Sequence, residues 1–269
     1  MNKPNFFLVG APRCATTAMC QYLDRHPSIY ISKPKEPNFF DGDLLSLKPL
    51  HRSYTLEEYL DLFKAGERLL CGEGTVWYML SKTAARDIYQ FNPNAKILIM
   101  LRNPVDFLNS LHSHLVFYGY EDIKDFESAL QAEPDRRQGK RIPPGCNPTE
   151  LLFYSELLSF SEQIQRYLDV FDRSQIHFTI YDDFVKDTAG TYRKVLEFLG
   201  VNPNFTTNFE IVNSNKRSRN AIDPKFRQQL QSQYAEEVEK LSQLLDRDLS
   251  YWSNDSASEL KKANTQLVM

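Results

Sequence analysis

The sequence predicts an α/β fold of three layers, with a central parallel sheet flanked by helices. Two continuous apolar runs, Phe6–Gly10 and Lys96–Leu101, have the length and composition of strands buried on both faces. Strand-like and helix-like segments alternate along the chain, as parallel strands with helical crossovers require. With 269 residues, 42% of them hydrophobic, the chain can build one large core. We expect a single domain over residues 1–252 and a loose tail over residues 253–269.

Apolar periodicity and end signals place the elements in order. We expect strands at 6–10, 29–31, 69–72, 96–101 and 175–181. We expect helices at 16–25, 56–63, 81–90, 104–118, 122–131, 149–171, 188–199 and 223–245, with room for a break in 149–171. Ser81 and Asn103 are candidate caps, Pro104 suits a first helical position, and Gly200 suits a helix end.

Residues 133–147 interrupt this alternation. The stretch holds three prolines, two glycines, four cations and two acids. A long loop of this kind inside a compact domain is usually a lid or a binding loop, or else a mobile insertion. We expect a mobile loop that borders a substrate site, with a plain surface insertion as the open alternative.

The first strand leads into a segment suited to binding a phosphate. Gly10 permits a turn, and helical spacing begins a few residues later, at Thr16. The first amides of a helix lack intrahelical partners and face the positive end of its dipole. Arg13 adds a full charge, and the Thr16 and Thr17 hydroxyls add donors. An ordinary strand-to-helix turn remains the alternative for these residues taken alone.

This segment departs from the loop of ATP-dependent kinases, G-x-x-x-x-G-K-[ST]. Counting from Gly10, Ala15 replaces the second glycine and Thr16 replaces the lysine, while the cation lies earlier, at Arg13. The pattern therefore favours a nucleotide with a different terminal group over ATP with magnesium.

A second polar segment follows the strand at 96–101. Arg102 comes directly after that strand, and Ser110 lies about two turns into the helix that follows. Ligands of open α/β sheets bind at the carboxyl ends of the strands, where Arg102 is expected. An arginine that only caps its own loop is the alternative.

Together these segments resemble the PAPS-dependent sulfotransferases of the carbohydrate and heparan sulfate type and their soluble bacterial relatives. PAPS is 3′-phosphoadenosine 5′-phosphosulfate. The likeness implies a P-loop-like fold, sulfuryl transfer from PAPS and no metal. It implies that Arg13, Cys14, Ala15, Thr16 and Thr17 hold the 5′-phosphosulfate, with Arg13 also catalytic. It implies that Arg102 and Ser110 hold the 3′-phosphate.

Two further stretches fit the same resemblance. Residues 33–41, Lys-Pro-Lys-Glu-Pro-Asn-Phe-Phe-Asp, are similar to a segment whose glutamate is the proposed general base, which implies this role for Glu36. Glu36 could instead only pair with a neighbouring lysine. Residues 72–78 resemble a second family segment, but Gly74 replaces its usual lysine.

Four other side chains are candidates for the reaction. His112 and His114 follow Ser110 and titrate in the useful range, so they are the rival bases. Trp77 and Tyr78 are weak candidates for acceptor contacts, because aromatic residues near motifs more often belong to the core.

A basic cluster near residue 216 completes the candidates. Lys216, Arg217 and Arg219 lie within four residues that contain no acid. A comparable basic loop closes over the 3′-phosphate in the family, which implies donor binding here. A solvated basic linker is the alternative.

Composition limits the partners. A net charge of −3 argues against a nucleic-acid binder. No apolar run reaches the length of a membrane span or a secretory signal, so we expect a cytoplasmic enzyme. The spacing of the four cysteines fits neither a zinc site nor a disulfide framework. A thiol nucleophile at Cys14 is disfavoured because sulfuryl transfer needs none.

Two other functions stay open at this point. One is a nucleotide kinase that uses ATP and magnesium, and the other is a non-catalytic nucleotide-binding module. For the leading interpretation, the acceptor is a small molecule, a glycan or a carrier-bound group. The choice between a hydroxyl and an amine, and the oligomeric state, cannot be read from these residues.

Overall fold

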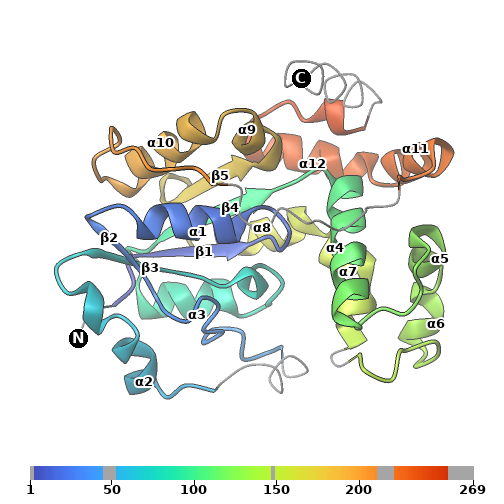
Figure 1. Ribbon diagram of the computed structural model, residues 1–269, viewed down its shortest axis with the longest axis horizontal. Coiled ribbons are helices and arrows are strands. Elements are labelled where there is room, and N and C mark those ends of the chain that lie inside the picture. Colours follow the sequence, from blue (N-terminus) through green and yellow to red (C-terminus); the bar gives the residue numbers. More distant parts are fainter. Residues whose placement is uncertain (1–2, 45–52, 147–148, 211–220, 254–269) are drawn as a thin grey trace. The chain divides into compact units, whose positions relative to one another are not determined.

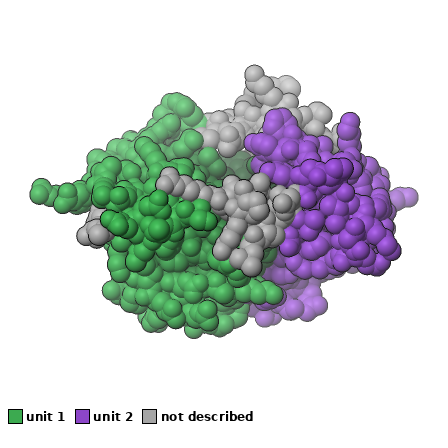
Figure 2. Space-filling model, turned by 90° about the horizontal axis from the view of Figure 1, so that it is seen from below, with its two compact units in different colours: residues 1–102, 163–216 green, residues 103–162, 217–269 purple. Residues whose placement is uncertain are grey.

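The computed structural model describes residues 3–44, 53–146, 149–210 and 221–253 (Figure 1). The chain that the sequence assigns to one domain forms two compact units (Figure 2). Unit 1 comprises residues 1–102 and 163–216, and unit 2 comprises residues 103–162 and 217–269. Among the described residues, no helix is both long enough and apolar enough to cross a membrane.

Unit 1 is built on a parallel sheet of five strands, which confirms the predicted fold class. The strands are β1 (Phe6–Gly10), β2 (Ile29–Ile31), β3 (Leu70–Gly74), β4 (Lys96–Leu101) and β5 (Ile176–Ile180). Their order across the sheet is β2-β3-β1-β4-β5, so β1 is central. Phe6 is in register with Gly72 on one side and with Lys96 on the other. The apolar run of β1 is buried throughout, as a central strand requires.

Helices cover this sheet on both sides. Unit 1 contains α1 (Thr16–Asp24), α2 (Leu56–Asp61), α3 (Ala84–Phe91), α9 (Tyr181–Lys186) and α10 (Thr188–Leu199), with the short turns η2 (Lys64–Gly66), η3 (Val76–Met79) and η5 (Arg173–Gln175). Helix α8 (Phe160–Leu168) runs from unit 2 into unit 1. In Figure 1, α1 and α10 lie on one side of β1 and α3 lies on the other.

Unit 2 is helical. It contains α4 (Pro104–Tyr118), α5 (Phe126–Gln131), α6 (Glu133–Arg137), η4 (Thr149–Leu152), α7 (Tyr154–Leu157), α11 (Pro224–Gln233), α12 (Ala235–Leu245) and η6 (Ser250–Trp252). Helix α4 begins as predicted, because the Asn103 side chain accepts hydrogen bonds from the amides of Val105 and Asp106. Arg227 of α11 donates to Asp106 over 2.8 Å and ties these two helices together.

Several predicted helices are shorter than expected. The segment 149–171 is divided into η4, α7 and α8, and the segment 223–245 is divided between Gln233 and Ala235. Helix α3 begins at Ala84 because Ser81 Oγ accepts the amides of Thr83 and Ala84 and so precedes the helix as a turn. Helix α5 begins only at Phe126, since Asp125 caps it through the Ser128 amide.

The stretch 133–147 is more ordered at its start than the sequence suggested. Residues 133–137 form α6, and Arg136 is fully buried in an ion pair of 2.7 Å with Glu121. Tyr154 donates to the other carboxylate oxygen of Glu121 over 2.9 Å. A buried pair of this kind is stable only when its remaining polar atoms are satisfied, and Arg136 also donates to the carbonyls of Ala129 and Arg141. The expectation of a mobile loop is therefore wrong for 133–137. Asn147, at the other end of the stretch, lies outside the described residues.

Candidate active site

The loop between β1 and α1 has the backbone shape expected of a phosphate site. Arg13 and Ala15 adopt left-handed conformations with φ of 62° and 66°, and Ala11 donates its amide to Met100 of β4 over 2.8 Å. Ala15 precedes α1 without any side-chain cap, so the first amides of the helix are not used by a local hydroxyl or carboxylate. The helix start can therefore offer its amides and its dipole to an anion.

Close packing explains the glycine at the end of β1. A Cβ at Gly10 would lie 2.7 Å from the Cβ of Met79, which is closer than real side chains approach. Within this loop Cys14 is fully buried, and burial raises the pKa of its thiol to about 12. The thiol is therefore neutral at physiological pH, which agrees with the expectation that Cys14 contributes no nucleophile.

Arg102 lies at the carboxyl end of β4, the strand beside β1. Its side chain is buried, its Nη1 donates to the carbonyl of Arg13 over 3.3 Å, and its guanidinium stacks 4.2 Å from the ring centre of Tyr181. Its Nε has no hydrogen-bond partner among the described residues. Because β1 and β4 are parallel neighbours, the loop after β1 and Arg102 meet at one sheet edge. A buried arginine with an unused donor suits a phosphate oxygen.

Tyr181 was missed by sequence reasoning. It follows β5 directly and opens α9, a helix that the sequence analysis did not place. The available signal was an aromatic residue at the carboxyl end of a predicted strand. A position one residue past a third strand of the same parallel sheet brings Tyr181 to the edge that carries Arg102.

Residues 36–41 form the Glu36 loop, and the segment after β3 holds its backbone in place. The Glu36 amide donates to the Gly74 carbonyl over 3.1 Å, and the Asn38 amide donates to Thr75 Oγ1 over 3.4 Å. Tyr78 Oη accepts the amides of Phe39 and Phe40 over 2.8 and 3.2 Å. These contacts fix the backbone of a loop in which Glu36 and Asn38 both have positive φ.

The Glu36 side chain pairs with Lys35. The ammonium bonds Oε1, while the Glu36 side chain remains 30% exposed. The Lys35 stem also passes Gly74, because a Cβ at Gly74 would lie 3.8 Å from Lys35 Cε and 2.5 Å from Cys20 Sγ. The lysine that the resemblance suggests at position 74 would not fit. Lys35 instead brings a cation into this part of the sheet edge.

The structure changes the interpretation of Tyr78. Its side chain is fully buried and its hydroxyl is used by the Glu36 loop, so it supports that loop and does not face an acceptor. Trp77 is half-buried, and its acceptor role stays a prediction.

The two histidines and Ser110 lie on α4, in unit 2. His112 is buried, its Nε2 lies 2.8 Å from the Ile123 carbonyl, and burial lowers its pKa. A ring already engaged by a main-chain carbonyl is a poor candidate for a base. His114 is half-buried and packs against Tyr118, with ring centres 4.6 Å apart. Ser110 is buried, and its donor-binding role stays a prediction. Lys216, Arg217 and Arg219 lie outside the described residues.

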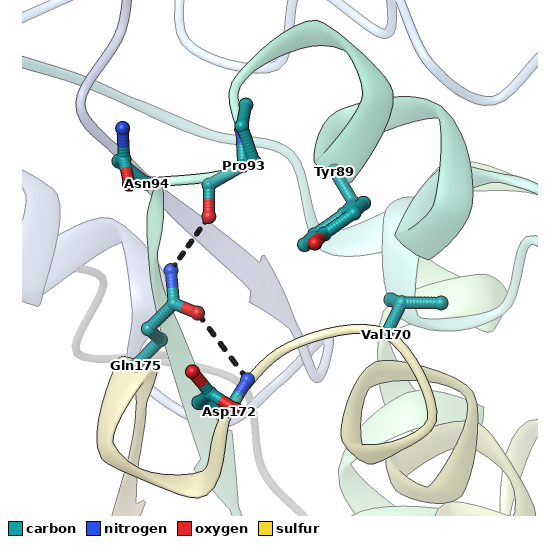
Figure 3. A pocket seen from close by; sticks show the side chains of 6 residues that line it. All are labelled: Tyr89, Pro93, Asn94, Val170, Asp172 and Gln175. Carbon is teal, nitrogen blue, oxygen red and sulfur yellow. Dashed lines mark hydrogen bonds between the residues drawn. The ribbon is translucent and has the colours of Figure 1, made fainter.

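A pocket of about 430 Å³ lies at the amino ends of β4 and β5, away from the ends that carry Arg102 and Tyr181 (Figure 3). Its lining residues precede β4 and β5 or flank them: Tyr89, Pro93, Asn94, Val170, Asp172 and Gln175. Gln175 donates to the carbonyls of Pro93 and Ala95 and accepts the Asp172 amide, so its side chain closes two turns against each other. These contacts give Gln175 a structural role at this pocket. Among the described residues, no group of three or more His, Cys, Asp or Glu side chains is arranged to hold a metal.

With this geometry established, comparison with known proteins identifies the class. Residues 3–243 match the model of the sulfotransferase domain family, and the chain belongs to that family. It is similar to the crystal structure of a sulfotransferase from Alicyclobacillus acidocaldarius, with 33% identity and a TM-score of 0.81. That similarity covers 94% of this chain and 100% of the other.

Curated relatives are more distant. Human carbohydrate sulfotransferase 15 is 24% identical over 258 residues, which cover 74% of this chain and 44% of the relative. The mouse bifunctional heparan sulfate N-deacetylase/N-sulfotransferase 4 is 26% identical over 216 residues, which cover 75% of this chain and 23% of the relative. The chain thus spans less than half the length of these relatives.

Proposed function

We propose that this chain transfers a sulfuryl group from PAPS to a hydroxyl or an amine of an acceptor, with Glu36 as general base. The observation that carries the proposal lies at the carboxyl ends of the neighbouring strands β1 and β4. There the loop that contains Arg13 and the buried Arg102 offer two sets of anion donors at the ends of neighbouring strands. Membership of the sulfotransferase family supports the same donor.

Each residue has a distinct task in this reaction. The amides at the start of α1, the Thr16 and Thr17 hydroxyls and Arg13 meet the charge that develops on the sulfuryl and bridging oxygens. Arg102 binds the 3′-phosphate and fixes the nucleotide, and the reaction then needs mainly alignment. The acceptor oxygen or nitrogen forms a bond to sulfur while the bond from sulfur to the bridging phosphate oxygen breaks.

Glu36 takes the proton that the acceptor loses. Lys35 bonds Glu36 Oε1, and no described residue bonds Oε2, so this oxygen can accept the proton. After transfer, PAP leaves as the desulfated product.

The acceptor class that we propose to test first is a glycan. The curated relatives are named for carbohydrate and heparan sulfate acceptors. Glycans offer both hydroxyl and amine groups, and either can be deprotonated by a carboxylate in this position. A cytoplasmic location remains a prediction.

Nucleotide binding tests the donor assignment. PAP at 100 times its dissociation constant should stabilise the fold by about 2.7 kcal/mol. ADP lacks the 3′-phosphate and should bind much more weakly, and ATP with Mg²⁺ should bind no better than ADP. Calorimetry that gives equal affinities for PAP and ADP would overturn the assignment. A screen of glycan acceptors with labelled PAPS then tests the transfer itself.

A further inference from the structure

A buried acid lies beneath the Glu36 loop, and the reaction described above does not use it. Glu73 is in β3, in register with Phe7 of the central strand, and its side chain is fully buried. Among the described residues, the Tyr78 and Tyr59 hydroxyls lie beside its carboxyl oxygens, but neither bond has full hydrogen-bond geometry. A carboxyl group in such a place is costly as an anion and much less so as a neutral acid.

Among the described residues, the titratable groups around Glu73 carry no positive charge. They are Tyr59 of α2, Tyr78 of η3, Asp41 of the Glu36 loop, Cys20 of α1 and Tyr167 of α8. Burial is the main reason that its pKa rises to about 8, and Asp41 adds to the rise. The neighbouring hydroxyls of Tyr78 and Tyr59 partly oppose this shift.

Tyr78 connects this acid to the loop above it. The phenol oxygen accepts the amides of both Phe39 and Phe40, so its two lone pairs are used. Its own proton must then be directed away from those amides, toward another acceptor. Tyr59 extends the same contact, because its ring stacks on Phe39 with centres 4.2 Å apart and planes inclined by 8°.

We propose that Glu73, acting as a neutral acid through the Tyr78 hydroxyl, is the positioning residue that holds the Glu36 loop in its active shape. The proposal rests on the function proposed above for Glu36. Neutral Glu73 offers an acceptor oxygen to the neighbouring Tyr78 hydroxyl and adds no negative charge beside Asp41. Ionised Glu73 would place a second carboxylate beside Asp41, at the end of the loop, and like charges in a buried site repel.

Hydrogen exchange measures this positioning without any acceptor. The probes are the Phe39 and Phe40 amides, compared at pH 7 and pH 9 as protection factors, which remove the intrinsic effect of pH on exchange. In the wild-type protein we expect protection to fall roughly tenfold between these values. The Glu73→Gln side chain is neutral at both pH values and can still accept a hydrogen bond from the Tyr78 hydroxyl. In this variant we expect no such fall.

Turnover gives the second measurement once an acceptor is known. Glu73→Gln should keep kcat within about threefold at pH 7 and should lose the alkaline decline, while Glu73→Leu should lose about 10²-fold in kcat. Tyr78→Phe should lose kcat to a similar extent as Glu73→Leu, because each variant lacks one of the two groups that hold the Phe39 and Phe40 amides in place. PAP affinity should stay within about twofold of the wild-type value in all three variants.

The outcomes separate this inference from the proposed function. Equal loss of protection with pH in the wild-type protein and in Glu73→Gln would overturn the role of Glu73, whatever the reaction is. Loss of turnover at pH 7 in Glu73→Gln, with Glu73→Leu no worse, would also overturn it. Failure of the wild-type protein to bind PAP would instead count against the proposed function and leave the exchange result to be judged alone.

Discussion

Replacing Arg102 by alanine should weaken the binding of PAP but leave the binding of a nucleotide that lacks the 3′-phosphate nearly unchanged. Arg102 is buried and makes one bond, of 3.3 Å, to the Arg13 carbonyl. Its Nε has no partner in the described part of the chain, and its charge is stacked on Tyr181. Most of its five donors can therefore be directed at a phosphate.

The size of the effect follows from these contacts. A hydrogen bond to a charged group contributes about 1.5–3 kcal/mol, which corresponds to a roughly 12- to 140-fold loss of PAP affinity in Arg102→Ala. Adenosine 5′-phosphosulfate has no 3′-phosphate, so its affinity should change by less than about threefold. Isothermal titration calorimetry of both ligands provides the measurement.

Two further variants separate binding from folding. Arg102→Lys keeps the charge but loses the planar fork, so its PAP affinity should lie between the wild-type and alanine values. Tyr181→Phe keeps the stacked ring and should change PAP affinity by less than about twofold. If Arg102→Ala weakens both nucleotides alike, Arg102 stabilises the loop of Arg13, and the 3′-phosphate binds elsewhere.

Two other predictions concern acids of unit 1. In Glu36→Gln, kcat should fall by ~10²–10⁴ with PAP affinity unchanged, as steady-state kinetics and calorimetry can show. His112→Ala and His114→Ala are the matched controls. Normal turnover in Glu36→Gln together with an inactive histidine variant would assign the base to α4. Loss of PAP binding in Glu36→Gln would mean that Glu36 instead holds Lys35 in place. For Glu73, the folded pKa of about 8 lies above the ordinary 4.5, so its contribution to stability is complete below pH 4.5 and declines as the pH rises to about 8. The free energy of unfolding, measured with urea, should therefore rise in Glu73→Gln relative to the wild-type protein as the pH increases from 4 to 9, by up to about 5 kcal/mol. Parallel pH curves for the two proteins would refute this.

Local signals were sufficient for the elements that carry the candidate phosphate sites. Strand β4 and helix α4 have the predicted bounds, because a long apolar run followed by Arg102, Asn103 and Pro104 ends a strand and caps a helix within a few residues. Helix α10 likewise ends at Gly200, whose left-handed conformation stops it. Signals of this kind act between near neighbours, so a single sequence displays them.

Breaks inside longer helices were decided by distant partners. The segment 149–171 has helical spacing throughout, yet the buried pair of Glu121 and Arg136 engages the Tyr154 hydroxyl, and the segment divides around it. Helix α6 could not be predicted for the same reason. A run with three prolines and several cations is typical of a loop, and only the buried ion pair of Arg136 with Glu121 shows otherwise. Tertiary contacts routinely override local preference in short helices.

The sequence by itself determined the main strands, the turn and helix start that follow β1, and the place of Arg102 directly after β4, since each depends on residues close together in the chain. Only the tertiary structure showed that Tyr181 stacks on Arg102, that Lys35 passes Gly74 to reach Glu36, and that Tyr78 is a buried support for the Glu36 loop. The physical reason is that parallel strands distant in sequence end at one edge, so side chains some 80 residues apart, such as Arg102 and Tyr181, come into contact there. Burial, too, is a property of the assembled core, and it is the main reason that the pKa of Glu73 rises to about 8, where the sequence shows an ordinary glutamate.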